Sequence, residues 1–165
     1  MDLKIYKNFM GNFWFLKLKE TLNSYNFPWY KGPILEENEK IQMVHKFYEF
    51  GKVLSDYFYL LNPCLELLNV KELARVKCNL ILKTPKIEEH GFHIDYEVKE
   101  KFRTAILYMN TNDGYTIFED GTKVESIENR FVSFDSGMKH SGTSCTDQRV
   151  RLVININYFE PELHK

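Results

Sequence analysis

Two histidines and an aspartate lie within the stretch "EEHGFHID" (88–95), and their side chains could bind a metal ion. Residues two apart on a strand face the same side, so we expect His93 and Asp95 to project together into a barrel interior. An imidazole and a carboxylate are suitable ligands for Fe(II), and a third ligand would complete one octahedral face. His90 would face the other way, as a loop residue or a neighbour of the site.

His140 is the best candidate for the third ligand. It follows the strand-like stretch "RFVSFDS" and lies far enough from His93 for the chain to return around a small barrel. His45 falls within an expected helix, and His164 falls in the C-terminal tail. The pattern therefore predicts a metal site of His93, Asp95 and His140, although a His-x-Asp tripeptide alone also occurs by chance.

Two arginines downstream strengthen this interpretation. Arg149 and Arg151 lie nine and eleven residues after His140, at one parity of a strand that also carries Val153, Asn155 and Asn157. A guanidinium inside a barrel is costly unless it is paired. A dicarboxylate co-substrate could supply the partner, because arginine binds carboxylates through its planar fork. A solvated strand end or a surface ion pair remains the alternative for either arginine.

The elements that must position these residues differ between the two halves of the chain. Residues 1–72 have a mainly helical pattern, and residues 73–160 have the short, regularly spaced strands of an antiparallel barrel or jelly roll. We expect an edge strand over 3–9, a helix over 11–24, a loop over 26–33, a long helix over 37–61 and a short helix over 64–70. The expected strands cover 73–83, 101–110, 130–136 and 150–159, with a hairpin over 116–127 that turns at Asp120-Gly121 in type I′ geometry.

Together these motifs resemble the Fe(II)- and 2-oxoglutarate-dependent dioxygenases, in the prolyl-4-hydroxylase-like branch. The resemblance covers most of the chain and rests on "HID" (93–95), "KHSGTS" (139–144) and "RVRLVININY" (149–158). The stretches "ILYMNTNDGYTIFEDGTKV" (106–124), "RVKCNLIL" (75–82) and "FPWY" (27–30) also look like segments of small members. It implies a mainly β (α+β) double-stranded β-helix, a jelly roll with N-terminal supporting helices, as one domain over 1–165.

The resemblance also implies an activity and a set of site residues. His93, Asp95 and His140 would bind Fe(II), and a C–H bond would be hydroxylated as 2-oxoglutarate and O2 become succinate and CO2. Arg151 would bind the C5 carboxylate of 2-oxoglutarate; Arg149 is the second candidate, because other branches place the basic residue nine or ten positions after the histidine. Tyr108 resembles the tyrosine that hydrogen-bonds this carboxylate, and weaker candidates for the pocket wall are Asn110, Thr116 and Asn79.

Composition limits the remaining possibilities. The chain has 165 residues and a formal net charge of −1, with no strong signal for nucleic acid or an anionic membrane. Three widely spaced cysteines predict no disulfide framework, and "FMGNFWFL" (9–16) is too short to span a membrane, so we expect a cytoplasmic protein. The substrate could be a peptidyl proline or a small metabolite, and the oligomeric state is not readable. A cupin-like metal-binding barrel or a non-enzymatic binding module are the alternatives.

Overall fold

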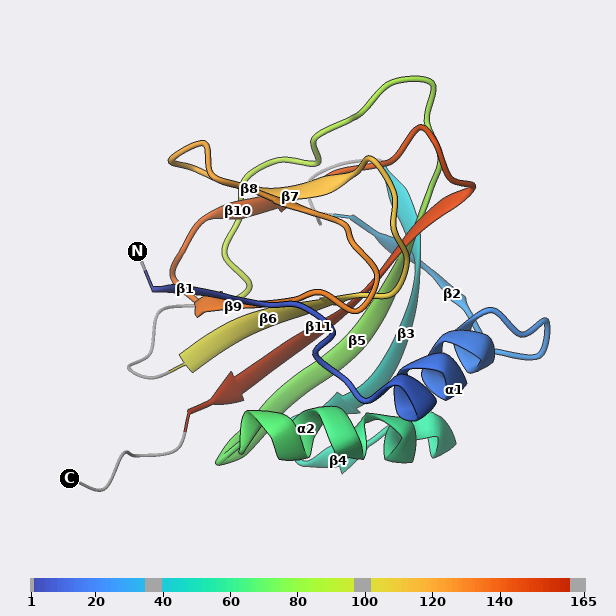
Figure 1. Cartoon of the computed structure of the whole chain (residues 1–165), viewed down its shortest axis with the longest axis vertical. Coiled ribbons are helices and arrows are strands. Elements are labelled where there is room, and N and C mark those ends of the chain that lie inside the picture. Colours follow the sequence, from blue (N-terminus) through green and yellow to red (C-terminus); the bar gives the residue numbers. More distant parts are fainter. Residues whose placement is uncertain (1, 35–39, 97–101, 161–165) are drawn as a thin grey trace.

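Two antiparallel sheets form most of the fold (Figure 1), which is that of a jelly roll. The computed structural model describes residues 2–34, 40–96 and 102–160. The large sheet has the order β1 (Leu3–Tyr6), β9 (Phe131–Asp135), β6 (Phe102–Tyr108), β11 (Val150–Phe159), β5 (Glu72–Leu82), β3 (Ile41–Glu49) and β2 (Tyr30–Pro33), with β4 (Lys52–Val53) paired to β3. The small sheet has the order β10 (His140–Gly142), β7 (Tyr115–Phe118) and β8 (Lys123–Glu125).

The two faces of the large sheet are buried against different partners. The helices α1 (Asn12–Leu22) and α2 (Asn62–Leu68) and the 3-10 helix η1 (Asp56–Leu61) lie on one face, while the small sheet lies across from the other (Figure 1). Alternation along β11 produces this division: Ile154 and Ile156 join the core under the helices, and Val153 joins the core between the sheets. The odd-numbered residues of β11 therefore face the space between the sheets.

The helix expected over 37–61 is wrong. Residues 41–49 form the strand β3, Phe50 and Gly51 turn the chain with φ of 41° and 82°, and only Asp56–Leu61 is helical, as η1. Apolar residues at 41, 44, 47 and 48 imitate helical spacing because both faces of β3 are partly covered. The first half of the chain is therefore not mainly helical, and residues 37–39 of the expected helix lie outside the described residues.

Most other expected elements are confirmed. The edge strand is β1, the first helix is α1, and the strands after residue 72 lie where the alternation placed them. The tip of the β7–β8 hairpin differs, because only Gly121 has a positive φ, of 86°, whereas a type I′ turn needs two such residues. Gly121 N–H donates to the Phe118 carbonyl and Phe118 N–H donates to the Thr122 carbonyl, both at 2.9 Å, so the turn between Phe118 and Thr122 has three residues and ends on a left-handed glycine.

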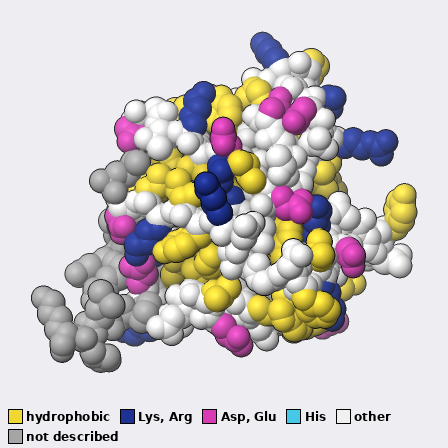
Figure 2. Space-filling view, viewed as in Figure 1, with side chains coloured by type: hydrophobic (Ala, Val, Ile, Leu, Met, Phe, Trp, Pro, Cys, Tyr) yellow, Lys and Arg dark blue, Asp and Glu magenta, His cyan; other side chains and the backbone are white. Residues whose placement is uncertain are grey.

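Charged side chains of both signs are dispersed over the face seen in Figure 2. On the face seen in Figure 2, Lys and Arg side chains lie among Asp and Glu side chains rather than in one continuous basic region. Over the described ranges 2–34, 40–96 and 102–160, no helix combines the length and apolar character needed to cross a bilayer.

Candidate metal centre and adjoining cavity

The three expected metal ligands converge. One donor atom from each of His93, Asp95 and His140 lies within 4.8 Å of the other two. His140 begins β10, and its backbone forms an isolated antiparallel bridge with His93, with N–H···O distances of 3.0 Å in both directions. The regular strand expected around His93 is thus reduced to one bridge, and this bridge places the two imidazoles side by side with centroids 4.7 Å apart.

Backbone carbonyls orient both imidazoles. Nδ1 of His140 donates to the Met138 carbonyl at 3.1 Å, and Nδ1 of His93 donates to the Gly91 carbonyl at 3.2 Å. This pattern leaves each Nε2 free to present its lone pair to a metal. Burial lowers the pKa of His140, despite the opposite effect of nearby Asp95, and this favours the neutral imidazole that a metal requires.

Asp95 is held by a small polar network. Its Oδ2 accepts hydrogen bonds from Asn157 Nδ2 at 3.0 Å and Thr104 Oγ1 at 3.4 Å. Its Oδ1 lies 3.9 Å from His93 Nε2 and 3.3 Å from a terminal nitrogen of Arg75, whose Nε donates to Asn157 Oδ1 at 3.0 Å. Burial would raise the pKa of Asp95, but Arg75, His140 and Asn157 outweigh it and lower the pKa to about 2. The carboxylate is therefore ionised and aimed at the imidazoles.

A buried arginine without an acidic partner lies at the other end of the same cavity. Arg151 is 2% exposed, and its Nε donates to Ser126 Oγ at 2.8 Å. One terminal nitrogen donates to Thr116 Oγ1 at 3.3 Å, and Thr116 in turn accepts from Tyr108 Oη at 2.8 Å. Within the described part of the chain no carboxylate forms an ion pair with Arg151. A buried cation of this kind is costly unless an anionic ligand pairs with it.

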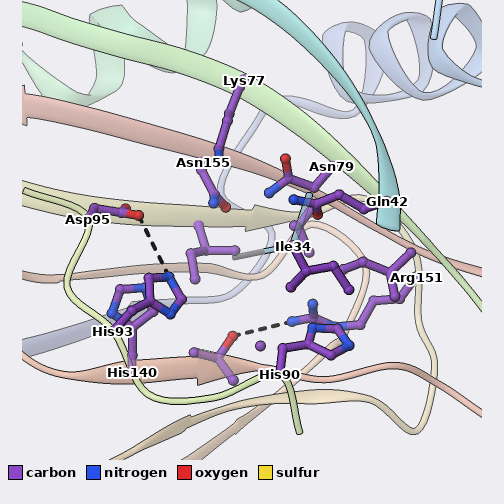
Figure 3. A pocket seen from close by; sticks show the side chains of 15 residues that line it. Ile34, Gln42, Lys77, Asn79, His90, His93, Asp95, His140, Arg151 and Asn155 are labelled. Atoms are coloured by element: carbon purple, nitrogen blue, oxygen red, sulfur yellow. Dashed lines mark hydrogen bonds and ion pairs between the residues drawn. The ribbon is translucent and has the colours of Figure 1, made fainter. Parts of the chain in front are cut away.

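The triad and Arg151 face one another across a narrow cavity of about 60 Å³ (Figure 3). Its walls come from four adjacent strands of the large sheet (β6, β11, β5 and β3), from β7 and β10 of the small sheet, and from the segment that carries His90, His93 and Asp95. The main polar contributors besides the triad and Arg151 are Gln42, Lys77, Asn79, His90, Thr116 and Asn155. The arrangement can hold a metal at one end and a carboxylate at the other.

No protein-family model and no curated protein matches this sequence. Solved structures do match: a prolyl hydroxylase from Trichoplax adhaerens in complex with a hypoxia inducible factor peptide fragment has a TM-score of 0.68 at 16% identity, over 96% of this chain and 83% of the other. A 2OG-Fe(II) oxygenase family oxidoreductase from Burkholderia pseudomallei gives 0.69 at 8% identity, over 94% and 84% of the two chains. The alpha-ketoglutarate-dependent epimerase of nogalamycin biosynthesis gives 0.70 at 11% identity, over 96% and 78%.

The fold is that of the 2-oxoglutarate- and iron(II)-dependent oxygenases.

The oxygenase resemblance left a choice between two arginines, and their positions differ sharply. Arg151 lines the cavity, whereas Arg149 precedes β11 and its side chain is exposed. Only Arg151 lies where a buried carboxylate could meet it.

Other residues expected in the oxygenase pocket have mixed positions. Thr116 and Asn79 line the cavity, and the Tyr108 ring packs against the Arg151 guanidinium with 5.7 Å between centroid and Cζ. Asn110 lies outside the cavity lining. Its Nδ2 donates to the Val150 carbonyl and its Oδ1 accepts from Leu152 N–H, both at 2.9 Å, so it anchors the start of β11.

His90 does not face away from the site as strand parity predicted. The segment before His93 is a loop, so the parity argument fails, and His90 lines the cavity on the Arg151 side without joining the metal triad (Figure 3). Burial, followed by the nearby Arg151 charge, lowers the pKa of His90 to about 4. This histidine is therefore neutral near pH 7.

In the row of β5 side chains that faces the site, sequence reasoning identified Asn79 but missed Arg75 and Lys77. Arg75 pairs with Asp95, and Lys77 lines the cavity. The signal was present, because residues 75, 77, 79 and 81 share one parity of a strand that was expected. Nothing along β5 itself, however, indicates which of its faces meets the metal site.

Proposed function

We propose that this chain is an Fe(II)- and 2-oxoglutarate-dependent oxygenase that hydroxylates a C–H bond of its substrate. One observation carries the proposal: a cluster of two imidazoles and a carboxylate and an unpaired, fully buried guanidinium lie at opposite ends of one cavity. Two histidines and one carboxylate on a single face are the ligand set of iron(II) oxygenases. The guanidinium supplies the matching site for a carboxylate.

Each group in the cavity has a role in this proposal. Nε2 of His93, Nε2 of His140 and Oδ1 of Asp95 would hold the iron. Arg151 would bind the C5 carboxylate of 2-oxoglutarate, with Thr116 and Tyr108 fixing its guanidinium. Iron and 2-oxoglutarate, once bound, supply the oxidising chemistry that converts 2-oxoglutarate and O2 to CO2 and succinate. Asn157 and Arg75 keep the Asp95 carboxylate turned toward the metal.

A cupin-like barrel or a binding module fits the cavity less well. The donor cluster of the described residues contains one carboxylate and two histidines, whereas a cupin site uses more histidines together with a glutamate. Neither alternative explains a buried guanidinium that faces the metal site without an acid. The oxygenase hypothesis accounts for both ends of the cavity with one pair of ligands.

The substrate class is open to two proposals. The solved structures of this fold include a prolyl hydroxylase bound to a peptide fragment and an epimerase bound to nogalamycin RO, so both peptides and small molecules are used by such proteins. The fold by itself does not choose between them.

An anaerobic titration with Fe(II) and 2-oxoglutarate tests the proposal. Chelation of iron by a 2-oxo acid is expected to give a visible charge-transfer band in the parent protein and none in His140→Ala. Arg151→Ala should need far more 2-oxoglutarate to reach the same band. Arg149→Ala is the matched control, because this arginine lies two positions away with an exposed side chain. Absence of the band in the folded parent protein would contradict the proposal. An equal increase in the 2-oxoglutarate needed by both arginine variants would also contradict it.

A further inference from the structure

A wider groove opens beside the metal triad. Its volume is about 710 Å³, and it is bordered by the end of β2, by β3, by β5 and by the segment that carries His93. The groove and the narrow cavity share Gln42, Lys77, His93 and Asp95, whereas Arg151 borders the cavity alone. A molecule in the groove could therefore reach the metal from the side opposite the proposed co-substrate site.

Lys77 occupies the junction of these two spaces. It lies in the middle of β5, opposite Asn155 of β11 and Lys46 of β3. In Figure 3 its side chain extends from β5 into the site near Asn155. Lys77 therefore lies at the centre of the large sheet, and its ammonium points toward the space that the cavity and the groove share.

Among the residues that the structure describes, Lys77 differs from its cationic neighbours in having no partner. Arg75 is paired with Asp95, and the Lys46 ammonium is held by both Glu49 carboxylate oxygens at 2.9 and 3.0 Å. Lys77 forms no hydrogen bond or ion pair with any residue that the structure describes. Burial and the charge of Arg75 lower the pKa of Lys77 to about 8, so it is still mainly protonated at pH 7. A half-buried ammonium in this state favours an anionic ligand.

Two amide groups beside Lys77 also lack partners. The Oδ1 atoms of Asn155 and Asn79 are buried and accept no hydrogen bond within the described part of the chain. Both amides line the cavity, and Asn79 is 6% exposed. Buried amide oxygens are nearly always satisfied in folded proteins, so these two indicate a ligand that carries N–H or O–H groups.

We propose that Lys77 binds an anionic group of the primary substrate, a carboxylate or a phosphate, while Asn155 and Asn79 accept hydrogen bonds from its donors. This inference rests on the proposed oxygenase function. It places the two anionic ligands at different cations: 2-oxoglutarate at Arg151 and the substrate at Lys77. A neutral prolyl side chain without an adjacent acid would leave Lys77 unpaired, so the substrate is a small acid or an acidic residue of a peptide.

Matched acid and neutral compounds test the inference. Succinate formation is measured in the protein loaded with Fe(II) and 2-oxoglutarate, with each standard L-amino acid beside its carboxamide and phosphoserine beside serine. A peptide arm compares N-acetylated aspartyl and glutamyl peptide amides with their asparaginyl and glutaminyl counterparts. We expect only acidic members to stimulate succinate formation. The arm in which stimulation occurs distinguishes a free acid, a phosphate ester and an acidic peptide.

Three lysine variants complete the experiment. Lys77→Met should raise the concentration of the acid needed for half-maximal stimulation by about tenfold or more, since one partner of a partly buried charge pair is lost. Lys4→Met is the control and should change this concentration by less than about twofold, because Lys4 pairs with Glu160 at 3.0 Å at an exposed site and borders neither the groove nor the cavity. Lys77→Arg should require less of the acid for half-maximal stimulation than Lys77→Met does, because it keeps the positive charge.

Several outcomes would overturn the inference. Equal stimulation by acids and their neutral counterparts would do so, as would no stimulation by any acid. An unchanged acid concentration for half-maximal stimulation in Lys77→Met would also do so. A weakened 2-oxoglutarate titration in Lys77→Met would instead assign this lysine to the co-substrate. The anaerobic charge-transfer band of the parent protein is recorded separately, so loss of the band identifies failure of the oxygenase proposal itself.

Discussion

Arg151 lies directly against Gly114: a Cβ added at Gly114 would stand 2.8 Å from Arg151 Cδ and 2.6 Å from the Ser144 carbonyl oxygen. The glycine thus leaves the space that the buried arginine side chain occupies. This close approach brings the loop before β7 into contact with the start of β11. The position of the guanidinium therefore depends on the absence of a side chain at residue 114.

Gly114→Ala should therefore both destabilise the protein and weaken 2-oxoglutarate binding. The backbone carbonyl cannot move away freely, and we expect a loss of about 1–3 kcal/mol in the free energy of unfolding. Urea unfolding and the anaerobic titration measure the two effects. Gly11→Ala is the control, because a Cβ there meets nothing within 4 Å. An unchanged 2-oxoglutarate requirement in Gly114→Ala would show that Arg151 is not displaced.

Arg151→Met should separate folding from ligand binding. Removing a buried cation that has no acidic partner relieves its desolvation cost, so the ligand-free protein should lose no more than about 1 kcal/mol of stability. In the parent protein, 2-oxoglutarate with a divalent metal should raise Tm by preferential binding to the folded state. Thermal unfolding should show this rise largely abolished in Arg151→Met. A rise equal to that of the parent would remove Arg151 from the co-substrate site.

Asn157→Leu should weaken metal binding without removing any ligand. Asn157 donates to Asp95 Oδ2 and accepts from Arg75 Nε, so it fixes both the carboxylate and its cationic neighbour. Loss of such an outer hydrogen bond typically costs about 10–100-fold in metal affinity. Anaerobic titration with Fe(II) or Co(II) measures this. Thr104→Val should have a smaller effect, because its contact with Asp95 is longer, at 3.4 Å; the reverse order would contradict this account.

His45 should make stability depend on pH in the mildly acidic range. Its Nδ1 donates to the Pro28 carbonyl at 2.7 Å and its Nε2 accepts from Ser55 Oγ at 2.8 Å, and burial lowers its pKa below the ordinary value of 6.5 despite the Pro28 hydrogen bond. The unfolded chain therefore binds a proton at this residue before the folded protein does. The stability contribution is present above about pH 6.5 and is lost as pH falls through the lower, folded pKa.

Urea unfolding at pH 7.5 and pH 5 in the parent and His45→Asn measures this contribution. The parent should lose more stability on acidification than the variant, which has no imidazole at this position. The comparison isolates His45 from His90 and His140, which are present in both proteins. Equal losses in the two proteins would contradict the assignment.

The alternation along β11 could be read directly from the chain. A strand has a period of two, and the polar residues at 151, 155 and 157 between apolar ones at 152, 154 and 156 already separate two faces. The same local reasoning placed β5, β6 and β9, and His93, Asp95 and His140 form the donor cluster that their types and order predicted. These properties depend on neighbours along the chain.

The errors occurred where local spacing fits two structures. Apolar residues at 41, 44, 47 and 48 satisfy a helical face, yet β3 pairs with both β2 and β5 and buries parts of both its faces. His90 is a loop residue and a neighbour of the site, as expected, but its direction was wrongly predicted because strand parity does not hold in the loop before His93. In each case contacts with distant strands outweighed the local pattern.

Which charges become buried, and which remain without a partner, was decided only by the tertiary structure. Arg149 and Arg151 have the same residue type and the same parity, but only Arg151 is enclosed, against Thr116 and Ser126 from the opposite sheet. Lys77 and Lys46 have the same residue type, but Glu49 pairs with Lys46, whereas packing leaves Lys77 beside the metal triad with no partner in the described part of the chain. Side-chain chemistry and strand period are local properties, whereas desolvation and pairing depend on groups that folding brings together from far along the chain.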